Sequence, residues 1–409
     1  MIRRLTLSIL ALTLITAGAS QPFSRAGIAA APPVAPAFNL GKFEANIKQS
    51  LDGKATGYAY AINVNGQLKR SGSNGVAVRA SDIKTDQEIA NPVPQLPTKR
   101  MNIASVTKTI TAAAVLKAIQ DKKVVGYPNL TVDWKIDPFL PLSWTRGKDV
   151  KDVTFKELLS QYSGMNYDVK GSTSIQSLRT WIAGGVTRPK DEWKYINANL
   201  AIFRVILPYM LANEQTRKGW NTLAVSDDAA LNDSVSSEFR RHVRELIFEP
   251  MGIKDADFKS ADPLPTRLYS TANKTKGYVV GDWLLVGGGG GWFLSAVDLA
   301  RFLANLRYND QILTPATRRL MEANRLGWRP PKEYDSVVGK HGQYFAHGGE
   351  LVYGSGENTV GMASGIMDYG NGVQVALLIN SLGTYGNKIG LLRDAFDNAW
   401  VINEIKIQP

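Results

Sequence analysis

Apolar runs bounded by turns that contain Gly and Asn lie near both ends of the chain, and these runs predict β-strands. Residues 57–64 and 67–69 flank an Asn65-Gly66 pair, which is a strong signal for a two-residue hairpin turn. Residues 362–367 and 373–379 form a second pair of apolar runs around a Gly-containing turn. The pattern therefore predicts antiparallel strands from both ends of the chain.

Between these strands, the apolar residues recur at helical spacing. A Thr-x-x-Glu capping box opens the segment 154–160, and residues 200–207, 239–248 and 295–306 are apolar at helical positions. A last helix is predicted over residues 389–400. The middle of the chain is thus expected to be mostly helical.

This order of elements predicts an α/β (α+β) fold, in which an antiparallel sheet is flanked by helices and interrupted by a mostly helical insertion. We assign the α/β domain to residues 41–124 and 271–409, and the helical insertion domain to residues 125–270. A length of 409 residues and a hydrophobic content of 44% suit a chain that buries a large core.

The N-terminal residues follow a different pattern. A charged start, an apolar run over residues 5–15 and the small residues at 17–19 predict a secretory signal peptide over residues 1–19. The Pro-containing residues 20–40 are expected to be a linker. The chain has no cysteine, so no disulfide framework accompanies the predicted export. We therefore expect a bacterial protein that is periplasmic or secreted after cleavage of the signal.

The formal net charge of +12 favours association with an anionic surface such as the cell envelope. The Lys and Arg residues are scattered, however, and no basic motif with interleaved aromatic residues predicts nucleic-acid binding. Three histidines and no cysteine leave no convincing metal site, and we expect no cofactor. The glycine run 287–291 lacks the ending of a phosphate loop, and we expect it to let the backbone pass close to the active site. The sequence indicates no oligomeric state.

The candidate chemistry centres on Ser105 and Lys108, which lie three residues apart at the start of a segment that we predict to be a helix. A serine hydroxyl needs an adjacent base, and a lysine amine can be that base only when its pKa is lowered. A helix N-terminus also favours the negative charge that develops as the serine attacks. Ser81 and Lys84 have the same spacing, but a polar run without an apolar helix follows them. Ser105 is therefore the candidate nucleophile.

The segment 102–116 resembles the active-site helix of the serine β-lactamase and penicillin-binding superfamily. Further segments are similar, in the same order, to the class C β-lactamase, esterase and D-aminopeptidase branch of that superfamily. They are residues 154–165, Tyr195-Ile196-Asn197, residues 247–253, residues 290–302 and His347-Gly348-Gly349. The resemblance covers nearly all of residues 45–400 and implies a β-lactamase/transpeptidase-like fold.

The Tyr-x-Asn pattern is weak by itself, because it recurs at Tyr127, Tyr369 and Tyr385. These three copies lie in turns that contain Pro or Gly. Tyr195 is preferred because it lies in the helical part of the chain and precedes an apolar helix.

The resemblance implies acylation and deacylation of Ser105. Lys108, and Tyr195 as a phenolate or as a proton relay with Lys108, would take the serine proton and pass it to the leaving group. Which of the two is the base stays open. Asn197 would hydrogen-bond the substrate amide or the Lys108 amine, and the N–H groups of Ser105 and Glu350 would form the oxyanion hole.

The His347-Gly348-Gly349 motif falls where β-lactamases carry Lys-Thr-Gly. A lysine there meets the carboxylate of penicillins and D-Ala-D-Ala peptides, whereas histidine is shorter and largely neutral near pH 7. His-x-Gly occurs in esterase and D-aminopeptidase members of the branch. We therefore expect a small-molecule ester, amide or peptide-like substrate. We rank carboxylesterase-like hydrolysis first, a D-stereospecific aminopeptidase or amidase second, and a β-lactamase or DD-peptidase third. A catalytically silent envelope-binding protein on the same scaffold is the alternative from a different class.

Overall fold

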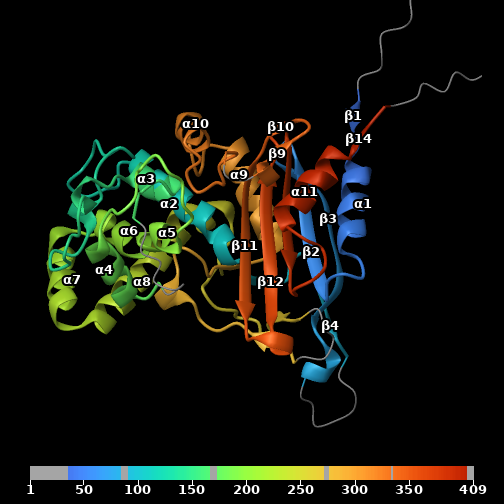
Figure 1. Ribbon diagram of the computed structural model, residues 1–409, viewed down its shortest axis with the longest axis horizontal. Coiled ribbons are helices and arrows are strands. Elements are labelled where there is room, and N and C mark those ends of the chain that lie inside the picture. The colour runs from blue at the N-terminus through green and yellow to red at the C-terminus, as the bar shows by residue number, and fades with distance from the viewer. Residues whose placement is uncertain (1–35, 84–90, 166–172, 271–275, 333–334, 403–409) are drawn as a thin grey trace, which may run out of the picture. The chain divides into compact units, whose positions relative to one another are not determined.

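Strands from both ends of the chain form one antiparallel sheet, as the sequence predicts (Figure 1). The computed structural model describes residues 36–83, 91–165, 173–270, 276–332 and 335–402. In this part of the chain, six strands follow the order β11-β12-β13-β2-β3-β4. They are β2 (Gly57–Val64), β3 (Gln67–Val78), β4 (Val93–Pro94), β11 (Phe345–Tyr353), β12 (Val360–Asp368) and β13 (Val373–Ile379).

The hairpin between β2 and β3 turns at Asn65 and Gly66, as predicted. Asn65 has φ 50° and Gly66 has φ 74°. Two successive left-handed residues are typical of a type I′ turn, whose twist matches that of the flanking strands. Strand β3 continues to Val78.

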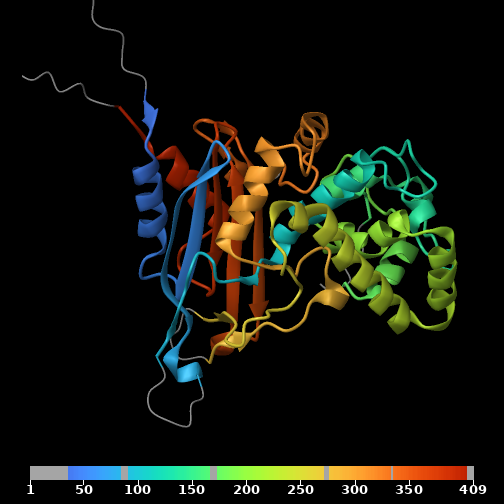
Figure 2. The ribbon, with the colours of Figure 1, turned by 180° about the vertical axis from the view of Figure 1, so that it is seen from behind.

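Two helices pack on one face of the sheet and a third packs on the other (Figure 2). Helices α1 (Leu40–Leu51) and α11 (Lys388–Asp397) contact each other, and helix α9 (Ala296–Tyr308) contacts β2 and β13. Helices α9 and α11 thus correspond to the predicted helices 295–306 and 389–400.

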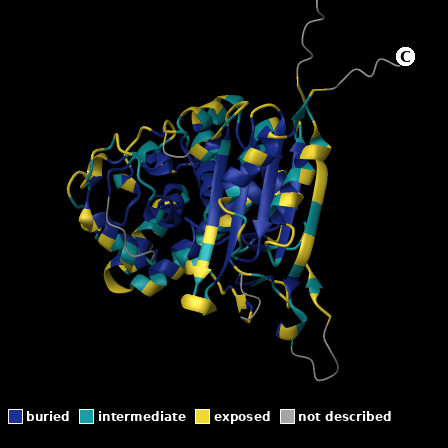
Figure 3. Ribbon diagram, turned by 45° about the vertical axis from the view of Figure 1, so that its right-hand side comes forward, coloured by how far each residue is buried: buried dark blue, intermediate teal, exposed yellow. Residues whose placement is uncertain are grey.

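The alternation of side chains along β2 explains this layering. Tyr58 and Tyr60 belong to the hydrophobic cluster formed with α1 and α11, whereas Ala59 and Ala61 belong to the cluster that includes α9. Both faces of β2 are therefore covered, and Figure 3 shows the central strands as buried. The outer strand β3 is exposed over most of its length.

The middle of the chain is mostly helical, as predicted. Its helices are α3 (Phe155–Ser160), α4 (Ile175–Gly184), α5 (Asn197–Ala201), α6 (Phe203–Leu211), α7 (Glu214–Ser226), α8 (Asp228–Val243) and the π-helical turn η5 (Arg244–Phe248). The predicted helix 200–207 spans the end of α5 and part of α6, and the predicted helix 239–248 spans the end of α8 and η5. The predicted capping box at Thr154 is present at the start of α3.

Helix α2 (Thr107–Gln120) follows the candidate nucleophile and is buried along almost its whole length. The other described elements are short or peripheral. They are α10 (Pro315–Ala323), β1 (Ala37–Phe38), β5 (Met101–Asn102), β6 (Arg267–Leu268), β7 (Tyr278–Val279), β8 (Phe293–Leu294), β9 (Val338–Gly339), β10 (Gly342–Gln343) and β14 (Trp400–Val401).

Residues Phe38–Trp400 form one compact unit. The domain borders that we predict at residues 41–124, 125–270 and 271–409 stay predictions. The predicted signal peptide, residues 1–19, lies outside the described residues. Among the described helices, none has both the length and the apolar character needed to cross a membrane.

Candidate active site

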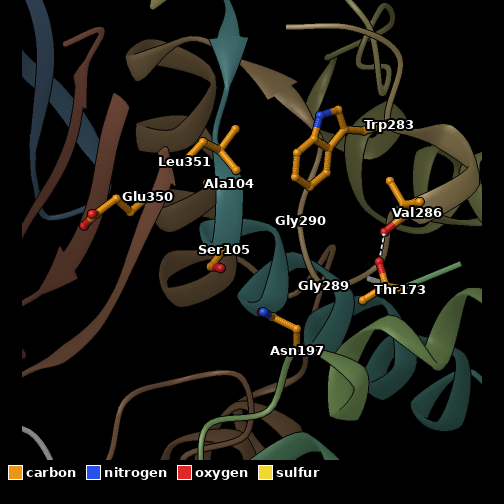
Figure 4. Close-up of a pocket in the computed structure, with 10 residues that line it drawn as sticks. All are labelled: Ala104, Ser105, Thr173, Asn197, Trp283, Val286, Gly289, Gly290, Glu350 and Leu351. Atoms are coloured by element: carbon orange, nitrogen blue, oxygen red, sulfur yellow. Dashed lines mark hydrogen bonds between the residues drawn. The ribbon is translucent and has the colours of Figure 1, made fainter. Parts of the chain in front are cut away.

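Ser105 lies in a tight turn directly before α2 (Figure 4). The turn is the 3₁₀-helix η2 (Ala104–Val106), so Ser105 precedes the α-helix and does not lie inside it. Ala104 has φ 47°, a left-handed conformation that is uncommon for a residue with a side chain. The Ala104 N–H donates to Asn102 Oδ1 at 2.8 Å, and this bond supports the turn. The strained turn presents Ser105 at the start of a buried helix.

Lys108 lies beside Ser105, as the spacing predicts. Its Nζ donates to Ser105 Oγ at 3.0 Å, to Asn197 Oδ1 at 2.9 Å and to the Gly289 carbonyl at 2.5 Å. The side chain is fully buried, and burial is the main cause that lowers the pKa of Lys108. A lysine with a lowered pKa loses its proton more readily and can then accept one from the serine hydroxyl.

The glycine run 287–291 passes along the start of α2. The Gly289 carbonyl accepts from Lys108, and the Gly288 carbonyl accepts from Thr111 Oγ1 at 2.7 Å. Gly288 has φ 94°, and a Cβ on Gly289 would lie 3.0 Å from the Asn197 carbonyl oxygen. The run therefore lets the backbone approach the site closely, as predicted.

Gln161 joins two motifs that the sequence keeps apart. Helix α3 ends at Ser160 because Gln161 adopts a left-handed φ of 69°. The Gln161 Oε1 atom then accepts from the Ile196 N–H at 3.0 Å and from Asn199 Nδ2 at 2.7 Å. These bonds hold the backbone between Tyr195 and Asn197 in place beside Lys108.

Tyr195 lies between two cations. The Nζ atom of Lys108 is 4.9 Å from the centre of the tyrosine ring, and Cζ of Arg329 is 3.9 Å from it. Burial alone would raise the pKa of Tyr195, but Lys108 and Arg329 outweigh burial and lower it. Lys108 and Ser105 both approach the buried Tyr195 hydroxyl closely enough to favour its deprotonated form. The hydroxyl therefore lies within reach of both members of the Ser105–Lys108 pair.

Sequence reasoning missed Arg329, because no motif marks it. The residue follows Trp328 in the segment before β11, and its backbone N–H donates to the Ala346 carbonyl at 3.0 Å. This bond attaches the segment to the edge of the sheet, and the side chain lies over Tyr195. The aromatic and Pro neighbours of Arg329 in the sequence are the only local signal that could have drawn attention to it.

His347 lies on the edge strand β11, as predicted, and only 3% of it is exposed. Burial, followed by the charges of Arg329 and Lys108, holds the pKa of His347 well below its ordinary value. Its Nδ1 is 2.9 Å from the Gly348 carbonyl oxygen. A neutral imidazole donates to that carbonyl through Nδ1–H and leaves Nε2 as an acceptor.

The next three residues of β11 form the wall beside Ser105. A Cβ on Gly349 would lie 2.6 Å from the Ile103 carbonyl oxygen, so only glycine fits there. Along a strand, the N–H and C=O of one residue point to the same edge, and the edge alternates from residue to residue. Because the Ala346 carbonyl accepts from Arg329 on the free edge, the N–H groups of Gly348 and Glu350 also point to the free edge.

The side chain of Glu350 points away from the pocket in Figure 4. Its Oε2 accepts from Lys388 Nζ at 2.7 Å on the other side of the strand. Only the backbone of Glu350 is therefore presented to Ser105.

An open pocket lies over Ser105 (Figure 4). Besides Ser105, Asn197, Glu350 and two glycines of the run 287–291, its walls include several residues that sequence reasoning missed. They are Ala104, Thr173, Trp283, Val286 and Leu351. Among the described lining residues there is no Lys or Arg. Glu350 lines the pocket with its backbone, because its carboxylate pairs with Lys388.

The competing Ser-x-x-Lys copy is placed differently. Ser81 is exposed in a short 3₁₀-helix over Ala80–Asp82, and Lys84 lies outside the described residues. In the part of the chain that the structure describes, no three His, Asp or Glu side chains are grouped closely enough to hold a metal ion.

A scan against protein-family models matches the family described as "Beta-lactamase" over residues 43–217 and 225–396. No curated protein matches the chain at a significant level.

Solved structures share the fold at low sequence identity. EstCE1, described as a hydrolase with promiscuous acyltransferase activity, superposes with a TM-score of 0.61 at 16% identity, covering 87% of this chain and 97% of the other. A class C beta lactamase from Rhodobacter sphaeroides gives 0.59 at 14% identity, covering 87% and 98%. A D-stereospecific amidohydrolase from Streptomyces sp. gives 0.57 at 15% identity, covering 88% and 99%. At these identities the likeness shows the fold alone.

Proposed function

Because the chain belongs to the beta-lactamase family, we propose that it is a serine hydrolase that forms an acyl-enzyme on Ser105. The observation that carries the proposal is the 3.0 Å contact between Ser105 Oγ and the buried Nζ of Lys108. A nucleophile within hydrogen-bond reach of a base that is itself held by a third group is the arrangement that covalent catalysis needs. Asn197 is that third group, since its Oδ1 accepts from Lys108.

In the acylation step, Ser105 Oγ attacks the substrate carbonyl carbon, and its proton passes to Lys108 or Tyr195. The bond to the leaving group then breaks, and the leaving group takes that proton. Water later attacks the acyl-enzyme by the reverse route and restores Ser105. Both candidate bases have a lowered pKa, so the choice between them stays open.

The oxyanion of each tetrahedral intermediate needs two N–H donors. We propose the N–H groups of Ser105 and Glu350. The strand direction supports Glu350, because its N–H points to the free edge of β11 that faces the pocket.

We propose that the preferred substrates are uncharged carboxylic esters. The described lining of the pocket has no cation to receive a carboxylate, and the low pKa of His347 keeps it neutral. EstCE1, a hydrolase by its description, shares the fold, as does a D-stereospecific amidohydrolase, which makes amide hydrolysis the next candidate.

One observation favours a different substrate. Arg329 is a buried cation close enough to His347 to lower its pKa, and such a cation could attract a substrate carboxylate. A β-lactamase or DD-peptidase activity is therefore the further candidate that the experiment has to separate.

A substrate panel tests the proposal. Nitrophenyl esters of short acids, D-amino-acid amides and nitrocefin are given to the wild type, to Ser105→Ala and to Ser81→Ala. We expect ester turnover that Ser105→Ala abolishes and Ser81→Ala retains. A fluorophosphonate should label Ser105, as mapped by peptide mass spectrometry. No label and no turnover would instead favour the catalytically silent protein.

We also propose that the protein is exported and acts in the periplasm or outside the cell. The signal-peptide pattern over residues 1–19 and the net charge of +12, which favours an anionic envelope, support this. Cell fractionation with an antibody, together with N-terminal sequencing of the mature chain, tests it.

A further inference from the structure

One face of strand β11 continues outward from the catalytic centre. Side chains at alternate positions of a strand share a face, so Gly349, Leu351 and Tyr353 line up in this direction. Gly349 lies against the Ile103 carbonyl beside Ser105, and Leu351 lines the pocket. The line from Gly349 to Tyr353 is about 13 Å long at the usual rise of a strand.

A second apolar wall stands on the other side of Ala104. Figure 4 shows Leu351 and Trp283 on either side of Ala104, with Val286 further along the same wall. The indole of Trp283 lies against the glycine run, because a Cβ on Gly290 would be 3.2 Å from its Cζ3. The backbone N–H of Trp283 donates to the Phe258 carbonyl at 2.9 Å. The glycines thus make room for a tryptophan beside the nucleophile.

The outer end of these two walls is aromatic. The rings of Tyr353 and Tyr278 are stacked, with centroids 4.4 Å apart and an interplanar angle of 26°. A side-chain interaction with Trp283 opposes the rise in the pKa of Tyr353 that burial causes, so Tyr353 lies close to Trp283. Tyr278 is 41% exposed, and its accessible ring continues the apolar surface outward.

The position of the proton donors decides which part of a substrate lies here. The leaving group must receive its proton from Tyr195 or Lys108, and these two residues line a separate small cavity together with His347. Neither of them lines the open pocket that contains Trp283 and Leu351. The leaving-group atom that takes the proton therefore faces Tyr195 and Lys108, and we place the acyl chain along the apolar walls on the other side of Ser105.

We propose that Gly349, Leu351, Tyr353, Trp283, Val286 and Tyr278 form an acyl groove that binds the hydrocarbon chain of a medium-chain acyl group. The inference rests on the proposed function and names its substrate class. A hydrocarbon chain bound in the acyl groove would cover apolar side chains that are partly exposed in the free protein, and this burial favours binding. Each methylene that becomes fully buried contributes up to about fourfold to kcat/KM.

The test compares nitrophenyl acetate, butyrate and octanoate, which differ only in the acyl chain. We expect kcat/KM for octanoate to exceed that for acetate by at least about tenfold, a fraction of the full burial effect. Leu351→Gln should lower the octanoate-to-acetate ratio by about tenfold. Val352→Gln is the matched control, because Val352 is 51% exposed on the opposite face of the same strand.

A second pair of variants checks the other wall. Trp283→Ala should lower the same ratio, whereas Trp134→Ala, which removes an exposed tryptophan that does not line the pocket, should not. A wild type without chain-length preference would overturn the inference, as would equal effects of Leu351→Gln and Val352→Gln. If Leu351→Gln instead changes the dependence of kcat/KM on the alkyl chain length of a series of alkyl butyrates, the groove binds the alcohol part of the ester and not the acyl part.

The rate of covalent labelling by fluorophosphonates, which needs no ester turnover, tests the acyl groove separately from the proposed function. The rates at which ethyl and octyl fluorophosphonates label the catalytic serine depend on the groove but not on which substrate is natural. Faster labelling by the octyl reagent, reduced by Leu351→Gln, would support the acyl groove even if no ester were hydrolysed. Equal labelling rates together with rapid ester turnover would overturn the acyl groove and leave the proposed function intact.

Discussion

The guanidinium group of Arg329 lies over the ring of Tyr195, with Cζ 3.9 Å from the ring centroid. A second cation, Lys108, is 4.9 Å from the same centroid. Both charges favour a deprotonated tyrosine and oppose the effect of burial, so the pKa of Tyr195 is lowered. The same two charges add to burial in lowering the pKa of His347. Arg329 is therefore an electrostatic centre of the site, although it lines the small cavity and not the open pocket.

Arg329→Gln should move the acidic limb of the kcat/KM profile to higher pH. Removal of the positive charge raises the pKa of Tyr195 and of Lys108, and whichever is the base must lose its proton before it can act. We expect a loss of roughly tenfold near pH 7 that shrinks at alkaline pH. The measurement is kcat/KM for a nitrophenyl ester between pH 5 and 10, a range in which both side chains can titrate.

Arg325→Gln is the matched control for this prediction. Arg325 also lies over an aromatic ring, 4.2 Å from the centroid of Phe345, but does not face Tyr195. Its loss should leave the position of the acidic limb unchanged. If the acidic limb of Arg329→Lys lies at the same pH as in the wild type, the positive charge is what matters. If the acidic limb of Arg329→Gln also lies at the wild-type pH, the electrostatic role of Arg329 is contradicted.

Lys108→Ala and Tyr195→Phe should each lower turnover at least about a hundredfold, a typical contribution of acid–base catalysis. Each change removes a group that can carry the Ser105 proton. Tyr127→Phe is the control, because Tyr127 belongs to another Tyr-x-Asn copy and packs against Trp134 and Phe139. Full activity in Tyr195→Phe would mean that the tyrosine has only a packing role.

The catalytic centre could be located from the sequence because each of its motifs is local. Ser105 and Lys108 are neighbours whenever the segment is helical, and His347 is identified by the two glycines that follow it. The hairpin at Asn65 was predictable for the same reason, since two residues determine the turn. The actual geometry around Ser105 differs only in that a 3₁₀ turn precedes α2.

Arg329 and Trp283 could not be predicted, because nothing in their own segments requires them. Arg329 approaches Tyr195 only because its segment attaches to the free edge of β11 through Ala346. Trp283 approaches Ser105 only because the glycine run leaves space for its ring. Both placements depend on long-range packing, which a pattern along one chain does not contain.

Glu350→Pro should lower kcat about a hundredfold, the usual cost of removing one oxyanion donor. Proline removes the backbone N–H that points to the free edge, and an edge strand tolerates proline where the N–H is not part of the ladder. Glu350→Ala keeps the N–H and loses only the ion pair with Lys388, so its kcat should stay within about fivefold of the wild type. Thermal unfolding of both variants checks the fold. Equal activity in both variants would exclude this N–H from the oxyanion hole.

His347 belongs to the His347-Gly348-Gly349 motif, which resembles the Lys-Thr-Gly motif of β-lactamases. His347 is 3% exposed, and Arg329 and Lys108 already lower its pKa. A lysine introduced there would meet the same burial and the same two charges, so it would lose its proton or destabilise the fold. We therefore expect His347→Lys alone to change the ratio of kcat/KM for nitrocefin and nitrophenyl butyrate only slightly.

The double variant His347→Lys with Arg329→Gln removes one of the two repelling cations. A charged lysine that pairs with the nitrocefin carboxylate would contribute about 1.5 to 3 kcal/mol, or roughly ten- to a hundredfold in that ratio. Arg329→Gln alone is the control, because it should slow both substrates through Tyr195 without favouring either. If Arg329→Gln alone abolishes nitrocefin turnover and retains ester turnover, Arg329 binds the substrate carboxylate. The β-lactamase activity then replaces esterase activity as the proposed function. A ratio that the double variant does not move would mean that the walls of the pocket, and not this charge, determine which substrates are accepted.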